Sequence, residues 1–171
     1  LLGPEMRSTG EVLGLSESYG EAFYKAQEAV QSKLPLSGTV LISVNRKDKA
    51  EVVEVAKLFH ENNFRIIATE GTCQLINEAG IPAEKVKKLC EGRPNVLDEI
   101  TNGKVDIIVN SPVGKDSVYD DSYLRKAAIK GRIPYCTTMA AAMAAATGIH
   151  AVNNLDGGKI ASLQELHGRI K

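Results

Sequence analysis

Polar side chains of one chemical kind recur at five places along the chain, each at or just after the end of a short apolar run. Each place has at least one hydroxyl, amide or cation, and the residues are Ser43, Asn45 and Lys49; Thr69, Gly71 and Thr72; Lys88, Glu91, Gly92 and Arg93; Asn110 and Ser111; Thr137 and Thr138. Hydroxyls, lysines and the backbone N–H groups at helix starts are the groups with which proteins bind phosphate. These residue types therefore indicate an anion site, most simply a phosphate site, if the fold brings the five places together.

The segment Thr69–Thr72 (TEGT) suits such a site best. Gly71 lets a ligand approach the backbone closely, and Thr72 is expected at a helix start, which carries partial positive charge. Lys49 is expected in the first turn of another helix, where its charge opposes the helix dipole by roughly 0.3–1 kcal/mol. The ordinary alternative stays open for each residue alone, with Asp48 as a helix cap and Lys49 as a solvated surface side chain. Only the convergence of all five places argues for the anion site.

The elements that must position these residues follow from the hydrophobic pattern. Strands are predicted at residues 39–44, 64–68, 86–89, 105–109 and 133–137. Helices are predicted at residues 17–31, 48–62, 70–79, 95–102, 122–130, 138–147 and 162–170. Alternating strands and helices imply right-handed crossovers and a parallel sheet covered on both faces. We therefore expect a small doubly wound, Rossmann-like α/β fold with five parallel strands, in which ligands bind at the carboxyl ends of the strands. The segment 32–38, with Pro35, is the best domain boundary.

Composition excludes several classes of protein. Lys plus Arg number 21 and balance 21 Asp plus Glu, which argues against nucleic-acid binding. The sequence shows no apolar run of membrane-spanning length and no secretory signal, so no membrane partner is expected. Cys73, Cys90 and Cys136 are odd in number and lack metal-ligand spacing. They predict buried thiols, no metal site and a cytoplasmic location.

Motifs of catalysis are also missing from the sequence. It contains neither a Walker loop nor G-x-G-x-x-G, and no nucleophile–base pair is evident. Asp120 and Asp121 are interpreted as caps of the helix predicted to follow them. Because the sequence starts at Leu1, it is interpreted as a segment cut from a longer chain.

From end to end, the chain resembles the C-terminal segment of the large subunits of carbamoyl-phosphate synthetases. The resemblance rests on LGPEMRSTGEV at 2–12, TVLISVNRKDK at 39–49, ATEGT at 68–72, EGRPN at 91–95, IIVNSP at 107–112, PYCTT at 134–138 and ASLQELHGRIK at 161–171. It implies that residues 1–31 are the tail of the second ATP-grasp domain. Residues 32–171 would then form an allosteric domain with the methylglyoxal-synthase-like fold.

The resemblance also implies a role without catalysis or cofactor in this segment. The parent enzymes are ligases that make carbamoyl phosphate from glutamine-derived ammonia, bicarbonate and ATP, with Mg or Mn, for pyrimidine and arginine biosynthesis. The implied partners are the rest of the large subunit, the glutaminase small subunit and other copies of the chain. The implied effectors are UMP and IMP, with ornithine at the border to the synthetase domain.

The family's nucleotide-site pattern falls on residues that mostly belong to the strand-end set. It selects Ser43, Lys49, Thr69, Thr72, Lys88 and Asn110, with Gly71 inside the TEGT segment. For ornithine it selects Thr137. The chain departs from the pattern at Pro112, where the family has a threonine, so one hydroxyl and one backbone donor are missing.

Two alternatives accompany this interpretation. Methylglyoxal synthase, a lyase acting on a triose phosphate, shares the fold, but it needs a carboxylate base where this chain has Arg93, and a guanidinium cannot serve as that base. Relatives in the urea-cycle branch bind N-acetylglutamate instead of a nucleotide. The TEGT segment and two lysines from separate strand ends favour a nucleoside monophosphate.

Overall fold

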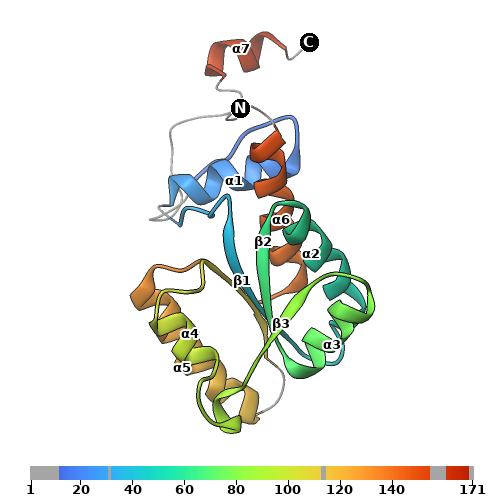
Figure 1. The fold of residues 1–171 in the computed structure, drawn as a ribbon. Coiled ribbons are helices and arrows are strands. Elements are labelled where there is room, and N and C mark those ends of the chain that lie inside the picture. Colours follow the sequence, from blue (N-terminus) through green and yellow to red (C-terminus); the bar gives the residue numbers. More distant parts are fainter. Residues whose placement is uncertain (1–11, 31, 113–114, 155–160, 170–171) are drawn as a thin grey trace.

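The computed structural model describes residues 12–30, 32–112, 115–154 and 161–169 (Figure 1). Over these residues the chain forms a parallel five-stranded sheet with the order β3-β2-β1-β4-β5. The strands are β1 (Gly38–Val44), β2 (Phe64–Thr69), β3 (Ala83–Val86), β4 (Ile107–Ser111) and β5 (Tyr135–Cys136). The prediction of a doubly wound α/β fold with five parallel strands is confirmed.

Helices cover both faces of the sheet, as Figure 1 shows. They are α1 (Tyr19–Ala29), α2 (Lys49–Glu61), α3 (Glu70–Glu78), α4 (Val96–Thr101), α5 (Lys115–Gly131), α6 (Met139–Asn154) and α7 (Leu163–Gly168), with a 3₁₀ turn η1 (Leu89–Glu91). Helices α1, α2, α3 and α6 share a core with one face of the sheet, and α4 and α5 share a second core with the other. The carboxyl ends of the strands remain open between these two layers.

Alternation along the strands supplies both cores from the same apolar run. Val40 and Ile42 of β1 lie in the first core, whereas Leu41 lies in the second, because successive side chains point to opposite faces. Buried strands of parallel sheets therefore read as continuous apolar runs. In α2, Phe59 is fully buried and meets Phe64 edge-on, with ring centroids 5.3 Å apart.

Helices α1 and α6 approach each other backbone to backbone. A Cβ atom placed on Gly20 would lie 2.9 Å from the Thr147 carbonyl oxygen, and one on Gly148 would lie 2.8 Å from the Gly20 carbonyl oxygen. Only glycine fits such distances. Helix α1, which the resemblance assigns to the preceding domain, thus packs directly on the last long helix of the sheet domain.

Several predicted boundaries are wrong by a few residues. Strand β3 ends at Val86 instead of starting there, because it is an edge strand whose Glu84 and Lys85 face solvent. Helix α6 continues past Gly148, which was expected to lie beyond its end, since that glycine serves the contact with α1.

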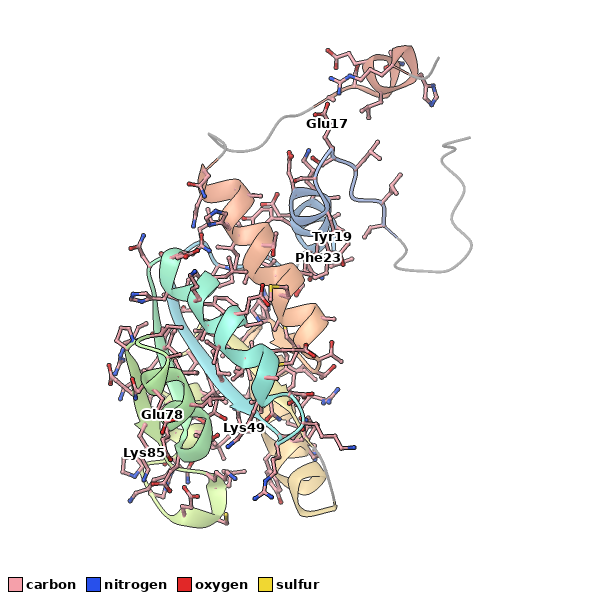
Figure 2. The ribbon with its side chains drawn as sticks, turned by 90° about the vertical axis from the view of Figure 1, so that its right-hand side faces the viewer. Glu17, Tyr19, Phe23, Lys49, Glu78 and Lys85 are labelled. Atoms are coloured by element: carbon pink, nitrogen blue, oxygen red, sulfur yellow. The ribbon has the colours of Figure 1, made fainter. Side chains whose placement is uncertain are left out.

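Both ends of the described chain lie at the same end of the molecule in Figure 1. Helix α7 starts with a reciprocal cap, in which the Ser162 hydroxyl accepts from the Glu165 N–H at 3.2 Å. Arg169 reaches the carboxylate of Glu17 at 2.6 Å, and Figure 2 shows Glu17 beside this helix. Leu166 of α7 is half-buried, while the side chain of Leu163 lies outside the described residues. No helix in the described ranges is long and apolar enough to cross a membrane.

Candidate functional site: a cationic pocket at the strand ends

A pocket of about 780 Å³ opens where β1, β2 and β4 end. Every residue predicted for the effector site lines it: Ser43, Lys49, Thr69, Gly71, Thr72, Lys88 and Asn110. The register explains the convergence, because Ser43 pairs with Asn110 across β1 and β4, and Ile42 pairs with Ala68, the residue before Thr69. The structure thus brings four of the five predicted places together at one edge of the sheet, whereas Thr137 and Thr138 are not among the lining residues.

Hydroxyl groups form the part of the pocket between β1 and β2. Thr69 and Thr72 are buried, the Thr69 hydroxyl donates to the Ser43 hydroxyl at 3.4 Å, and the Val44 N–H donates to the Thr72 hydroxyl at 3.5 Å. Thr69 occupies the N-cap position of α3, but its side chain accepts no hydrogen bond from the helix. The first N–H groups of α3 thus have no capping side chain, and such groups favour an anion.

Cationic side chains line the same pocket. Arg46, Lys47, Lys49 and Lys88 line the pocket, and none of them forms an ion pair with any residue that the structure describes. Lys49 lies closest to the backbone of α3, because a Cβ placed on Gly71 would be 3.3 Å from its Nζ. Figure 2 shows Lys49 where α2 begins, next to the end of β1. The pocket therefore carries a positive charge that the neutral composition of the chain conceals.

The loop between β1 and α2 is held by Asn45. Its Nδ2 donates to Asp48 Oδ2 at 2.6 Å and to Ser111 Oγ at 3.1 Å, and its Oδ1 accepts from the Lys47 N–H at 2.7 Å. Asp48 stands at the N-cap position of α2, yet its carboxylate bonds to Asn45 instead of to the helix. This loop holds the backbone of Lys47 and the first turn of α2 in place beside the pocket.

A buried hydrogen-bond network supports the β4 side of the pocket. Asn110 Nδ2 donates to Asp121 Oδ1 at 2.9 Å and to the Tyr135 hydroxyl at 2.8 Å. The Tyr135 hydroxyl donates to the same Asp121 oxygen at 2.7 Å, and Arg125 donates to the other at 2.9 Å. Burial alone would raise the pKa of Asp121, but the hydrogen bonds from Tyr135, Arg125 and Asn110 outweigh it and lower that pKa. Burial and the Asp121 carboxylate together raise the pKa of Tyr135, so the phenol stays protonated.

The prediction that Asp121 caps a helix is wrong. Helix α5 starts at Lys115, earlier than predicted, and Asp121 lies inside it with its side chain directed to β4. Asp120, interpreted in the same way, also falls inside α5, and its side chain lies outside the described residues. Sequence reasoning missed this network, because its members come from three separate elements.

Other predicted residues lie away from the pocket or differ in burial. Cys90 is exposed and lines the pocket, so the prediction of a buried thiol is wrong for it, whereas Cys73 and Cys136 are buried as predicted. Arg93 is exposed and pairs with Asp98, its Nε lying 3.0 Å from Oδ1. Thr137 is exposed just after β5, outside the lining.

Two further features complete the description of the site. Pro112 is half-buried beside Ser111 and contributes nothing to the pocket wall. Within the ranges described, no three His, Cys, Asp or Glu side chains are grouped as metal ligands would be.

Comparison with known proteins identifies the class that this fold and pocket represent. The family model of the MGS-like domain matches residues 51–137. The chain belongs to the MGS-like domain family.

The relatives are more particular. The chain is 51% identical over 151 residues to the carbamoyl phosphate synthase large chain of Acidobacterium capsulatum, covering 88% of this chain and 14% of the relative. It is 45% identical over 172 residues to the C-terminal section of that large chain from Methanocaldococcus jannaschii, covering 100% and 28%. It is 42% identical over 171 residues to the C-terminal section from Aquifex aeolicus, covering 98% of this chain and 32% of that relative. The chain thus spans a third or less of the length of these relatives and is similar to their C-terminal section.

A solved structure supports the fold alone. Methylglyoxal synthase from Elizabethkingia anophelis NUHP1 superposes with a TM-score of 0.52 at 16% identity, covering 81% of this chain and 95% of that one. The methylglyoxal-synthase-like fold expected from the sequence is confirmed.

Proposed function

We propose that this chain is the allosteric effector-binding domain of a carbamoyl-phosphate synthetase large subunit, and that its pocket binds a nucleoside monophosphate such as UMP or IMP. One observation supports the ligand class above all. Cations without an acidic partner among the described residues line the pocket into which the uncapped start of α3 opens, and Lys49 lies beside that start. An anion there would meet N–H groups, hydroxyls and ammonium groups together.

Phosphate fits this set of donors better than a carboxylate does. It has three acceptor oxygens and nearly two negative charges at neutral pH, so it can bind the N–H groups at the start of α3, the Thr72 hydroxyl and the ammonium groups of Lys49 and Lys88 at once. A carboxylate such as those of N-acetylglutamate offers two oxygens and one charge. The remaining volume has apolar walls from Leu89, Val96 and Leu124, which suit a ribose and a base.

The lyase alternative has little support from the pocket. A lyase of this kind needs a free carboxylate to remove a proton beside a carbonyl. Asp121 is the acidic side chain among the described lining residues, and both of its oxygens already accept hydrogen bonds. A carboxylate with a lowered pKa and occupied lone pairs is a weak base.

The wider assignment follows from the relatives. The parent enzyme would use ATP with Mg or Mn at sites outside this chain to make carbamoyl phosphate for pyrimidine and arginine biosynthesis. The rest of the large subunit and the glutaminase small subunit would be its partners, with contacts between copies of the chain, in the cytoplasm. Ornithine would bind near Thr137, at the border to the synthetase domain, and this domain itself would have no cofactor and no catalytic role.

Calorimetric titration of the chain with UMP, IMP, ornithine and N-acetylglutamate tests the proposal. We expect a nucleotide to bind more tightly than N-acetylglutamate, and Lys88→Ala to weaken it by about 1.5–3 kcal/mol, the range for a hydrogen bond to a charged group. Lys87→Ala is the matched control, because Lys87 is also exposed but does not line the pocket. Tighter binding of N-acetylglutamate, or equal effects of the two substitutions, would contradict the site assignment.

A further inference from the structure

The hydrogen-bond network behind the pocket determines which end of the Asn110 amide faces the ligand. The Asn110 Nδ2 faces this network and donates to Asp121 Oδ1 at 2.9 Å and to the Tyr135 hydroxyl at 2.8 Å. The Asn110 Oδ1 has no hydrogen-bond partner among the residues described. Among the described residues, every side-chain oxygen or nitrogen that is sealed from solvent has a hydrogen-bond partner. Because the Asn110 Oδ1 has none, it is not sealed, and it is open to the pocket that Asn110 lines.

The opposite orientation of the amide is unfavourable for a reason that lies in Asp121. An ionised carboxylate only accepts hydrogen bonds, and the bonds from Tyr135 and Arg125 help to lower its pKa. Turning the amide over would place Asn110 Oδ1 against a carboxylate oxygen. The Tyr135 hydroxyl would then also face an acceptor, the Asn110 Oδ1. It could not donate to that oxygen, because its one hydrogen is already donated to Asp121 at 2.7 Å. Asp121 therefore decides the orientation of Asn110.

We propose that Asp121 is a positioning residue that makes Asn110 a hydrogen-bond acceptor in the pocket, so that the site selects anionic ligands carrying an O–H or N–H donor beside the phosphate. This rests on the proposed function and adds a division of labour to it. The cations and the start of α3 bind the phosphate, whereas the Asn110 oxygen recognises a ribose hydroxyl or a base N–H. Inorganic phosphate would bind only to the cations and the start of α3, and would not need the Asn110 oxygen.

The substitution Asp121→Asn tests this in the full chain. Arg125 donates to one carboxylate oxygen at 2.9 Å, so an asparagine at 121 would turn its own oxygen to Arg125 and its NH₂ group to Asn110. The Asn110 amide would then turn over, and its NH₂ group, a donor, would face the O–H or N–H donor of the ligand. We expect the affinity for UMP to fall roughly tenfold, the loss of about one hydrogen bond, and the affinity for inorganic phosphate to change less than twofold.

A purely electrostatic effect would have the opposite sign, because removing a negative charge beside the pocket raises the affinity for every anion. Asp106→Asn is the matched control: it removes the same charge at the amino end of β4, where Asp106 accepts from the Thr39 N–H at 2.7 Å. In an Asn110→Ala background, Asp121→Asn should have no further effect on UMP, since it acts through Asn110. Thermal unfolding of each variant reports whether it is folded.

Two ligand arms distinguish the sources of the donor. With 2′,3′-dideoxyuridine monophosphate, the effect of Asp121→Asn disappears if ribose supplies the donor and persists if the base N–H does, and either result supports the proposal. A measurement without substitution is nuclear magnetic resonance of the Asn110 side-chain amide, in which the hydrogen bonded within the network should exchange slowly with and without UMP.

Three results would overturn the proposal while leaving the proposed function intact. They are an unchanged or higher UMP affinity in Asp121→Asn, an equal loss for UMP and phosphate, and a loss that persists in the Asn110→Ala background. Fast exchange of both amide hydrogens in the free chain would also overturn it. Failure of the unaltered chain to bind any nucleotide would instead overturn the proposed function, and this proposal with it.

Discussion

Replacing Gly71 with alanine should separate the stability of the domain from its binding of the effector. Gly71 is the second residue of α3, is exposed, and has no left-handed backbone conformation that would demand glycine. A Cβ placed there meets one heavy atom within 4 Å, the Lys49 Nζ at 3.3 Å. That atom ends a flexible side chain, so the protein accommodates the methyl group by a small shift of Lys49.

The expected changes in stability and affinity have opposite signs. Alanine is favoured over glycine by about 0.8–1.0 kcal/mol inside a helix, so the free energy of unfolding should stay equal or rise by up to that amount. The methyl group would stand between the first N–H groups of α3 and the ligand, and would move the Lys49 ammonium. Losing one charge-assisted hydrogen bond costs about 1.5–3 kcal/mol, which weakens UMP roughly 10- to 150-fold.

Calorimetric titration with UMP and thermal unfolding without ligand measure the two effects on one preparation. Gly168→Ala in α7 is the matched control, since a Cβ there meets nothing within 4 Å and Gly168 does not line the pocket. A Gly71→Ala chain that binds UMP as tightly as the unaltered chain would refute the phosphate position deduced from α3. A chain that loses binding together with stability would refute the reasoning that glycine serves the ligand and not the fold.

Three further outcomes are expected. Because the resemblance puts Arg93 where a lyase needs its carboxylate base, the purified chain should form no methylglyoxal from dihydroxyacetone phosphate, and turnover above background in a colorimetric assay would contradict the regulatory role. Iodoacetamide should label exposed Cys90 long before Cys136, since burial raises the pKa of the Cys136 thiol to about 11. UMP should slow the labelling of Cys90, which lines the pocket, as measured by mass spectrometry. Equal labelling rates of Cys90 with and without UMP would place the ligand elsewhere. The lowered pKa of Asp121 stabilises the fold above the unfolded pKa of about 3.9, and this stabilisation is lost as pH falls through the folded pKa. In urea unfolding, the stability advantage of the unaltered chain over Asp121→Asn should therefore shrink below about pH 4, and a constant difference would refute the ionised network.

The sequence predicted the sheet well because burial shapes the pattern of the central strands. Val40, Leu41 and Ile42 are completely buried, and such runs between turn residues are hard to mistake. The edge strand was shifted because Glu84 and Lys85 face solvent, which removes the apolar signal on which the prediction depends. Local pattern thus locates strands that are covered on both faces and misplaces those that are not.

The predicted site divides along the same line. The rule that ligands bind at the carboxyl ends of parallel strands located the lining residues, because position after a strand is a local property. The partners of Asn110 are not local: Asp121 is 11 residues away and Tyr135 is 25 residues away. Their meeting depends on the pitch of α5 and on the pairing of β4 with β5, which the spacing of residues in the chain does not reveal.

The contact between α1 and α6 has a mechanical meaning. Helix α6 starts directly after β5, and Gly148 lies roughly 14 Å along it from Met139, at 1.5 Å per residue. There the backbone of α6 lies against that of α1 at Gly20, so closely that neither glycine could carry a side chain. If α6 slides or tilts at the sheet, α1 is therefore expected to shift with it. Helix α1 and the sheet are therefore expected to move as one body.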